Sequence, residues 1–371
     1  MVVTSAVLSV LHSGKYLKKM NYTYIALIPK KNNPQLISVY RPINLGNVVY
    51  RIVSKVLANR IKNLLPQIIS DSQSAFMPNR LITDSTTIAY EMLHQMQNRR
   101  RGKVGHMAMK LVISEAYDHL EWDFLRKIML KIGLSKQWVN LAMESVITPT
   151  YSVFINGEPK WFISLSSEIR QGDPLFLYLF LLCAEGLSSL LQKATETHQI
   201  NGISSYKGGV QISHLLFADD SLLLCEAKTT KCQNLLKILA QYEEASGQAI
   251  NQQKTSLFFS HNTQLEDKEA IQGMLGAQIM TDCEKYLGLP MVGGKSRVST
   301  FKDIQEMISN RVMSWKEKFI SKAGREVLIV AQVIPTYSMS IFKIPKTICD
   351  GINLVLAKYW WGQKKKKKSL D

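Results

Sequence analysis

The sequence predicts an α+β fold, because strand-like and helical segments both occur and do not alternate strictly along the chain. Hydrophobic residues form 46% of the 371 residues and charged residues 20%, as in globular proteins. Two apolar runs within residues 210–225 have the pattern of a tight hairpin. Segments with apolar side chains at helical spacing lie on both sides of this hairpin.

In the first half of the chain, residues 45–69 predict an amphipathic helix with Lys and Arg on its polar face. Residues 86–96 predict a second helix, which runs into the basic turn NRRRGK. Residues 106–113 (HMAMKLVI) predict a strand, after which Ser114 is placed to cap a helix. Residues 175–191 predict a buried helix with Pro174 in its first turn.

In the second half, the runs VQISHLLF and SLLLCE predict two strands joined at Ala218, Asp219 and Asp220. A helix is predicted over residues 230–245, ending before Gly247, and a short strand over 255–259. Two amphipathic helices are predicted near residues 299–319 and 324–339.

The strong positive charge of the chain indicates a polyanionic partner. The net charge is +17, and the five lysines of residues 364–368 leave +12 (17 less 5) on the rest. Phosphate neutralisation drives binding by such surfaces, although charge alone does not separate RNA from DNA or from an acidic membrane. The five cysteines include no CxxC pair and the histidines no HExxH, so neither a zinc site nor a disulfide framework is predicted.

The chain is expected to be intracellular, nuclear or cytoplasmic, and not secreted. The longest apolar run, residues 175–184, is too short for a bilayer core of about 30 Å, so no membrane partner is expected. In residues 1–19 the basic residues follow the apolar stretch instead of preceding it, unlike a signal peptide.

Asp219 and Asp220 have two interpretations. Aspartate is common in turns, because its side chain bonds the local backbone. The apolar runs on both sides predict, however, that this turn packs against a core. Adjacent carboxylates need cations there, because an unpaired buried charge is costly. Hard oxygen ligands suit Mg²⁺, and two such ions about 4 Å apart can clamp the reacting oxygens of a phosphoryl transfer. That scheme needs a third carboxylate from another strand.

The segment LLFADDSLLL resembles the catalytic hairpin of reverse transcriptases, specifically those of plant non-LTR (LINE-type) retrotransposons. The resemblance covers nearly the whole chain. Further similar blocks occur in order: YIALIPK with YRPINL and SKVLANR, SQSAFMPNRLITD, MKLVISEAYD, IRQGDPLF, SGQAINQQKTSLFFS, YLGLPMVGGKS and the segment from SWKEKF to YWWG.

The resemblance implies a right-hand polymerase with fingers, a ferredoxin-like palm and a helical thumb. It implies RNA-templated DNA synthesis from dNTPs on a DNA primer, with two Mg²⁺ or Mn²⁺ ions. The segments expected are an N-terminal lead-in over residues 1–20, fingers and palm over 21–290, a thumb-like helical region over 291–361 and a basic disordered tail over 362–371. No oligomeric state is implied.

The same resemblance implies roles for individual residues. Asp219 and Asp220 match metal-binding, catalytic aspartates, and Lys254 lies in the segment that supplies a general acid for pyrophosphate. The remaining matches are substrate-binding positions: Arg41 and Arg80 near phosphates, Tyr117 as the gate against a ribose 2′-OH, Gln171 and Gly172 in the nucleotide pocket, and Gly288 in the hairpin that grips the primer. Taken singly, each of these residues has an ordinary structural reading as a core, surface or loop residue.

The third block departs from the family pattern at its essential position. The family reads KLD(M/I)SKAYD, whereas this chain has Val112 in place of the metal-binding aspartate. Valine offers no lone pair, so activity is expected to fall on the order of 10³-fold or more. Glu115 lies at an odd offset, on the opposite face of an extended strand, and Asp118 matches an aspartate that the family already has. Neither is expected to substitute.

Other positions depart from the pattern as well. Phe176 and Leu177 replace Ser-Pro, Asn79 replaces Gly and Asn44 replaces Ser. The segment GREVLIVAQVIPTY is shorter by about two residues, which rotates the rest of a helix by about 200°. The sequence therefore supports two hypotheses: a reverse transcriptase domain with impaired polymerase activity, and a nucleic-acid-binding relic or co-opted RNA or DNA binder without catalysis.

Overall fold

The computed structural model describes residues 2–114, 120–163, 170, 172–206, 208–280, 285–290, 297–316, 320–330 and 335–361. The chain divides into two compact units. The first comprises Met1–Leu81 and Arg100–Ile279, and the second comprises Ile82–Arg99 and Met280–Asp371. This division concerns compactness alone, so the predicted boundaries of fingers, palm and thumb stay predictions.

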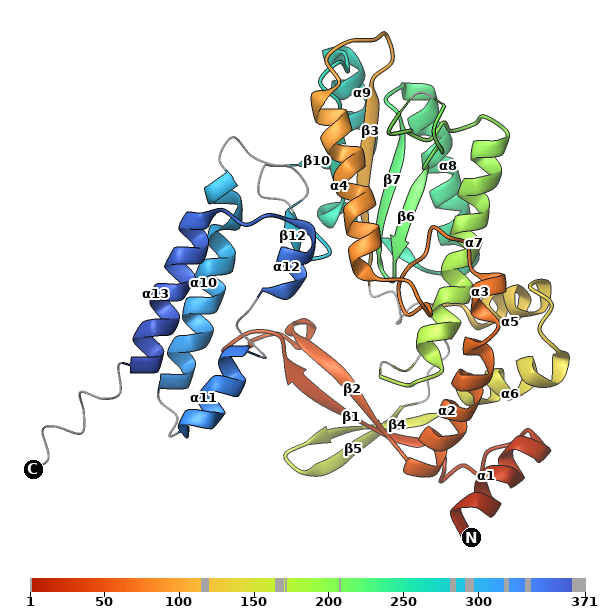
Figure 1. The fold of residues 1–371 in the computed structure, drawn as a ribbon. Helices are drawn as coiled ribbons and strands as arrows, with labels where there is room; N and C mark the ends of the chain where they lie inside the picture. Colours follow the sequence, from red (N-terminus) through yellow and green to blue (C-terminus); the bar gives the residue numbers. More distant parts are fainter. Residues whose placement is uncertain are drawn as a thin grey trace, which may run out of the picture. The chain divides into compact units, whose positions relative to one another are not determined.

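The first unit contains two sheets (Figure 1). The four-stranded sheet has the order β2-β1-β4-β5, formed by Tyr40–Gly46, Tyr22–Pro29, Thr150–Ile155 and Glu158–Ile163. The six-stranded sheet has the order β10-β9-β3-β7-β6, formed by Gln278–Ile279, Ser256–Phe259, His106–Ser114, Asp220–Glu226 and His214–Phe217. Its sixth strand, β8 (Ala249–Ile250), pairs with the end of β3. Helices and mixed sheets together confirm the predicted α+β class.

Helices of the first unit pack on the six-stranded sheet and against one another (Figure 1). They are α1 (Val2–Ser13), α2 (Val48–Lys62), α3 (Leu65–Ile68), α5 (Trp122–Lys131), α6 (Lys136–Ile147), α7 (Phe176–Glu196), α8 (Thr229–Ser246) and α9 (Leu265–Leu275). Two short 3₁₀ turns, Ile37–Val39 and Gln252–Lys254, complete the unit.

The strand β3 shows why the larger sheet forms here. Its side chains alternate between faces, and Met107, Met109 and Leu111 enter one core with α7, α8 and α9. Lys110 and Val112 lie on the other face, opposite Leu222 and Asp220 of β7. The core face is fixed by burial, and this burial also fixes the register that brings position 112 to the hairpin.

Helix α7 joins the two cores of the first unit. Its first half, including Phe176 and Phe180, packs with α1, α2, α5 and α6, and its second half, including Leu187 and Leu191, packs on the sheet. The helix has the length and apolar composition of a membrane span, with a mean hydropathy of 1.2. Burial of its apolar side chains in these cores accounts for that composition.

The second unit is largely helical. It contains α4 (Ile82–Asn98), α10 (Arg297–Lys316), α11 (Lys322–Leu328), α12 (Thr336–Ile341), α13 (Lys346–Trp361) and the hairpin of β11 (Lys285–Tyr286) with β12 (Leu289–Pro290). Helices α10 and α13 share an apolar core that includes Phe301, Val312, Trp315 and Ile348. The Thr86 and Tyr337 hydroxyls lie 3.1 Å apart and join α4 to α12.

Several predicted elements need correction. The helix predicted over residues 45–69 begins at Val48, after a strand, and Asn63 and Leu64 separate α2 from α3. Asn47 starts α2 by accepting a bond from the Val49 amide at 2.9 Å. Pro174 lies before α7, whose first residue is Phe176. Strand β6 begins only at His214.

The C-terminal region also differs from its prediction. The described parts of the helix predicted over residues 324–339 are two short helices, α11 and α12. Helix α13 lies in the region expected to be helical, although its bounds were not predicted. The residues at which Ser114 was to cap a helix, and the predicted tail, lie outside the described residues.

Candidate active site

The paired aspartates lie at the closed end of a hairpin, as the sequence predicts. Phe217 of β6 pairs with Asp220 of β7, so Ala218 and Asp219 form a two-residue turn. Ala218 has a φ of 53°, which is uncommon for a residue with a Cβ atom. Asp219 is exposed and Asp220 is half-buried. The turn presents one carboxylate to solvent and holds the other against the sheet.

Val112 lies directly opposite Asp220 on the neighbouring strand. The Ile113 amide donates to the Asp219 carbonyl at 3.3 Å. Such a bond flanks a non-hydrogen-bonded pair, in which the opposed side chains come closest. The side chain at position 112 therefore faces the carboxylate that a shared cation would contact, and it is an isopropyl group.

The pKa of the Asp220 carboxyl is raised from its ordinary value. Burial is the largest cause, the charge of Asp219 is the second, and the charge of Lys110 acts in the opposite direction. The sequence predicts that crowding raises the pKa of at least one carboxyl of the pair. That direction is confirmed, with desolvation as the larger cause.

The donor set at the hairpin falls short of a two-metal site. Within the described residues, no group of three or more His, Cys, Asp or Glu side chains is arranged to hold a metal ion. Asp219 and Asp220 supply two carboxylates, whereas Mg²⁺ takes about six oxygen ligands. Binding of Mg²⁺ or Mn²⁺ at this hairpin therefore stays a prediction, as does the interpretation that Val112 replaces a third carboxylate.

The loop with Lys254 reaches the same end of the sheet. Strand β8 pairs with Ile113 and Ser114, and the Asn251 amide donates to the Val112 carbonyl at 2.9 Å. The Asn251 side chain accepts from the Lys254 amide at 3.1 Å. Lys254 is exposed. Its backbone is thus brought to the strand end that carries position 112, and its role as general acid stays a prediction.

The guanidinium of Arg80 bonds the backbone of a nearby segment. Its Nη1 donates to the carbonyls of Ser70 at 2.5 Å and Gln73 at 2.6 Å. Its Nη2 donates to the carbonyl of Ile69 at 3.3 Å and the carboxylate of Asp71 at 3.0 Å. Four of its five N–H donors therefore face acceptors of residues 69–73.

Arg41 lies on β2, opposite Ile28 of β1, and is exposed. No described contact joins Arg41 to the hairpin with Asp219, so the structure does not bring these two predicted site residues together. The phosphate-binding roles of Arg41 and Arg80 both stay predictions.

Two buried charged residues flank the predicted nucleotide-pocket turn. Gly172 has a φ of 91°, which glycine adopts without steric cost, while Gln171 lies outside the described residues. Arg170 and Asp173, on either side, are 3% and 7% exposed.

Arg170 and Asp173 both contact helix α2, and Arg170 also contacts Asn21. The guanidinium carbon of Arg170 lies 4.2 Å from the centre of the Tyr50 ring, and its Nη2 donates to the carbonyl of Asn21 at 2.9 Å. Asp173 accepts from the Ser54 hydroxyl and from the Leu175 amide. The turn is therefore fixed at both ends.

The two remaining predicted positions fall elsewhere. Tyr117 lies outside the described residues. Gly288 forms, with Leu287, the turn of the β11–β12 hairpin in the second unit, and both residues have positive φ. The hairpin expected from YLGLP is present, and its contact with a primer stays a prediction.

Asn79 shows that one departure from the family pattern is mild. Its φ is 62°, a left-handed conformation that glycine adopts freely and that asparagine tolerates better than most residues. The change from the expected Gly to Asn therefore keeps the turn that precedes Arg80.

Sequence reasoning missed three residues that hold the site: Gln73, Arg170 and Asp173. The first lies in the block SQSAF, and the other two flank the QG pair. One feature of the sequence could have pointed to them: each is a polar or charged residue inside a motif that also contains apolar residues. No pattern in the sequence predicts which residue each of the three contacts.

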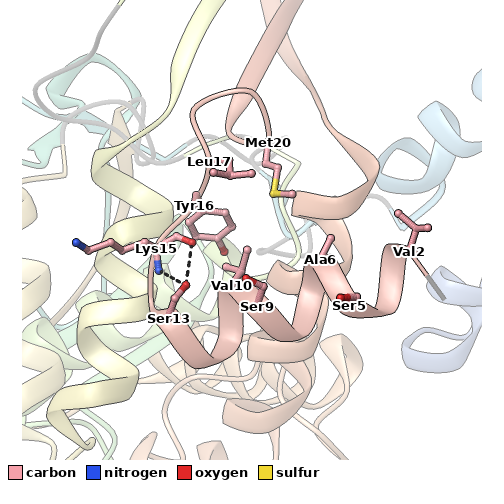
Figure 2. Close-up of a pocket in the computed structure, with 10 residues that line it drawn as sticks. All are labelled: Val2, Ser5, Ala6, Ser9, Val10, Ser13, Lys15, Tyr16, Leu17 and Met20. Carbon is pink, nitrogen blue, oxygen red and sulfur yellow. Dashed lines mark hydrogen bonds between the residues drawn. The ribbon is translucent and has the colours of Figure 1, made fainter.

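A hollow among the described residues lies away from these positions. Figure 2 shows it between α1 and the segment that follows, with Val10, Tyr16 and Met20 in its lining. Its volume is about 690 Å³. None of its lining residues belongs to the predicted site.

Two adjacent carboxylates lie at a hairpin of a mixed sheet, and paired carboxylates are the residue type that holds the metal ions of a phosphoryl transfer. The chain belongs to the reverse transcriptase family. The family described as "Reverse transcriptase (RNA-dependent DNA polymerase)" matches residues 28–291. This membership confirms the predicted right-hand polymerase fold.

The relatives include proteins of non-LTR retrotransposons. An uncharacterized 149 kDa protein of transposon TX1 from Xenopus laevis is 25% identical over 82% of this chain and 23% of its own length. A Pol polyprotein of the type-1 retrotransposable element R2 from Popillia japonica is 24% identical over 62% of this chain and 31% of its own. The chain thus spans less than a third of either relative.

Two solved telomerase structures, each in complex with a fragment of telomeric RNA, are loosely similar. The Candida tropicalis enzyme has a TM-score of 0.48 and 12% identity, covering 99% of this chain and 57% of its own. The Candida albicans enzyme has a TM-score of 0.47 and 14% identity, covering 97% and 63%.

Proposed function

We propose that this chain is the reverse transcriptase domain of a non-LTR retrotransposon lineage in which DNA synthesis is impaired by Val112. The supporting observation is the direct pairing of Val112 with Asp220. The hairpin, the neighbouring strand and the Lys254 loop meet at one end of the sheet, which supports the proposal. The missing element is one carboxylate.

A plant lineage is part of this proposal. An uncharacterized mitochondrial protein of Arabidopsis thaliana is 47% identical over 72 residues, which are 19% of this chain and 59% of that protein. The block order quoted from the sequence supports the same assignment.

The reaction proposed for the intact lineage is attack of a primer 3′-oxygen on the α-phosphate of a dNTP, with release of pyrophosphate. In this proposal, the exposed Lys254 supplies a proton to that leaving group. The raised pKa of Asp220 means that its carboxylate binds a proton more readily, which competes with cation binding.

Primer extension on poly(rA)/oligo(dT) tests the proposal. The unmodified chain is compared with Val112→Asp, and the double variant Val112→Asp with Asp219→Asn serves as the inactive control. We expect synthesis to rise on the order of 10³-fold in Val112→Asp and to vanish in the double variant. Robust synthesis by the unmodified chain would overturn the proposed impairment.

A second candidate function, nucleic-acid binding without catalysis, is favoured by the charge distribution. Residues 21–46, which form β1, β2 and their connection, contain no Asp or Glu but include Lys30, Lys31 and Arg41. Salt-dependent RNA gel shifts test this function. Affinity that falls steeply with salt supports it, and weak binding that salt does not change contradicts it.

A further inference from the structure

The segment of residues 69–74 forms a brace along the outer edge of the carboxylate-bearing hairpin (Figure 1). The Leu216 amide of β6 donates to the carbonyl of Ser72 at 2.8 Å, and the Ser74 amide donates to the Leu216 carbonyl at 3.1 Å. Gln73 therefore pairs with Leu216 as a parallel bridge. Strand β6 is an edge strand of the sheet, and the brace satisfies part of that edge.

The side chain of Gln73 extends the brace to the turn itself. Its Oε1 accepts from the Ala218 amide at 3.3 Å and from the Ala75 amide at 2.9 Å. Gln73 is 1% exposed, and its Nε2 has no hydrogen-bond partner among the described residues. Such a buried side chain is fixed by its surroundings and holds the residue that immediately precedes Asp219.

The turn needs an external hold because of its backbone conformation. Ala218 has a φ of 53°, where its Cβ atom crowds the following carbonyl. A strained conformation persists only where neighbouring groups determine it. The bond from Gln73 acts on the amide of this same residue.

Arg80 in turn fixes the brace. Its Nη1 and Nη2 bond acceptors of four of the five residues in 69–73. Only Nε is left, whereas a forked contact with phosphate uses two parallel N–H donors. The guanidinium is therefore committed to the backbone that carries Gln73.

We propose that Gln73 and Arg80 are positioning residues for the carboxylate turn: Arg80 fixes the 69–73 backbone, and Gln73 holds the Ala218 amide so that Asp219 keeps its place. This inference rests on the proposed function for its catalytic meaning. It differs from a role of Arg80 in direct phosphate binding.

Amide hydrogen exchange on the full chain tests the positioning role of Gln73 without any polymerase activity. In Gln73→Met, we expect exchange at Ala218 to accelerate about tenfold, as for loss of one hydrogen bond, with Leu222 to Leu224 unchanged. Gln73→Glu keeps an Oε acceptor and should retain the protection. The exposed Gln67, changed to Met, is the matched control.

The exchange experiment has clear contrary results. Unchanged exchange at Ala218 in Gln73→Met, or equal acceleration over the whole sheet, overturns the inference. If Gln73→Met does not fold, the Gln73→Glu variant alone tests the inference, because loss of protection at the Ala218 amide in that variant also contradicts it.

Kinetics in the Val112→Asp background separate the two roles of Arg80. If Arg80 is a positioning residue, Arg80→Lys lowers kcat and leaves the KM for dNTP within about twofold, because one ammonium cannot span the carbonyls. A raised KM with unchanged kcat assigns Arg80 to phosphate instead and overturns its part of the inference. Arg51→Lys, at an exposed position of α2, is the control.

The two proposals fail in distinguishable ways. If Val112→Asp shows no synthesis, the proposed function fails. The positioning role is then tested by amide hydrogen exchange at Ala218 in Gln73→Met and in Arg80→Lys. We expect the same acceleration of exchange in both variants.

Discussion

Val112 and Asp220 face each other across the β3–β7 ladder as a non-hydrogen-bonded pair. Side chains in such a pair lie about 4.5–5.5 Å apart at Cβ. Position 112 is therefore the β3 position in closest register with the Asp220 carboxylate. This geometry makes the effect of a single substitution measurable in several ways.

Val112→Asp should make the stability of the chain depend on Mg²⁺. Without cations, a carboxylate opposite Asp220 destabilises the fold by about 1 kcal/mol or more. Millimolar Mg²⁺ should then restore stability, because a ligand that binds only the folded state stabilises it. Urea unfolding with and without Mg²⁺ measures this effect. Val112→Asn is the uncharged control, and an equal response of the unmodified chain would contradict the prediction.

Asp220→Asn should stabilise the chain at neutral pH. Because the folded-state pKa of Asp220 is raised, folding favours its protonated form, and stability is lost as pH rises through that pKa. The asparagine side chain does not ionise and so removes this loss. The difference in unfolding free energy between the variant and the unmodified chain should therefore disappear below pH 3.8, the ordinary pKa of aspartate. Urea unfolding over a pH series measures it. Asp219→Asn should act in the same direction but less, and a difference independent of pH would refute the assignment.

His214→Gln should remove a loss of stability in acid. His214 is buried between the hydroxyls of Ser213 and Ser188, and burial lowers its pKa to about 4. The neutral ring is favoured in the folded state, so stability is complete above 6.5 and falls as pH decreases toward 4. The loss is roughly 3 kcal/mol by pH 4.

Unfolding of the His214 variant between pH 7 and pH 4 checks this prediction. The pKa of the nearby Glu185 is raised by burial, so this carboxyl contributes with the opposite sign and remains in both proteins. The exposed His261, changed to Gln, is the matched control. An acid loss of the same size in His214→Gln would show that another group causes it.

Arg170→Met should destabilise the first unit by about 3 kcal/mol. The substitution removes hydrogen bonds from a charged donor to Asn21, each typically worth about 2 kcal/mol, and a buried cation–π contact with Tyr50. Denaturant unfolding measures the change, with Arg51→Met as the exposed control. A loss below about 0.5 kcal/mol would mean that the buried guanidinium does not anchor the turn at Gly172.

The local elements of the site could be predicted from the sequence because each follows from a short pattern. Alternation in HMAMKLVI gives β3, two apolar runs around Ala218 give the hairpin, and Gly247, at a φ of 74°, ends α8 as expected. The register between β3 and β7, and thus the opposition of Val112 and Asp220, follows from the core face of each strand and from the family resemblance.

The contacts that hold the site could not be predicted in this way. Gln73 and Ala218 are 145 residues apart in sequence, and no periodicity links them. The family resemblance placed Arg80 near phosphates, and nothing in the sequence indicated that its guanidinium bonds the backbone of residues 69–73. Residues 1–20 were expected to be only a lead-in, whereas Val7 and Val10 of α1 enter the core.

The central strand β3 is paired along both edges, with β7 on one side and with β9 and β8 on the other. A backbone held in this way has little freedom to shift when the side chain at position 112 changes, so a substitution there acts mainly through the atoms of that side chain. Valine and aspartate codons can differ by a single base. A single base change at this codon would therefore place a third carboxylate opposite Asp220, in a strand whose register is already fixed.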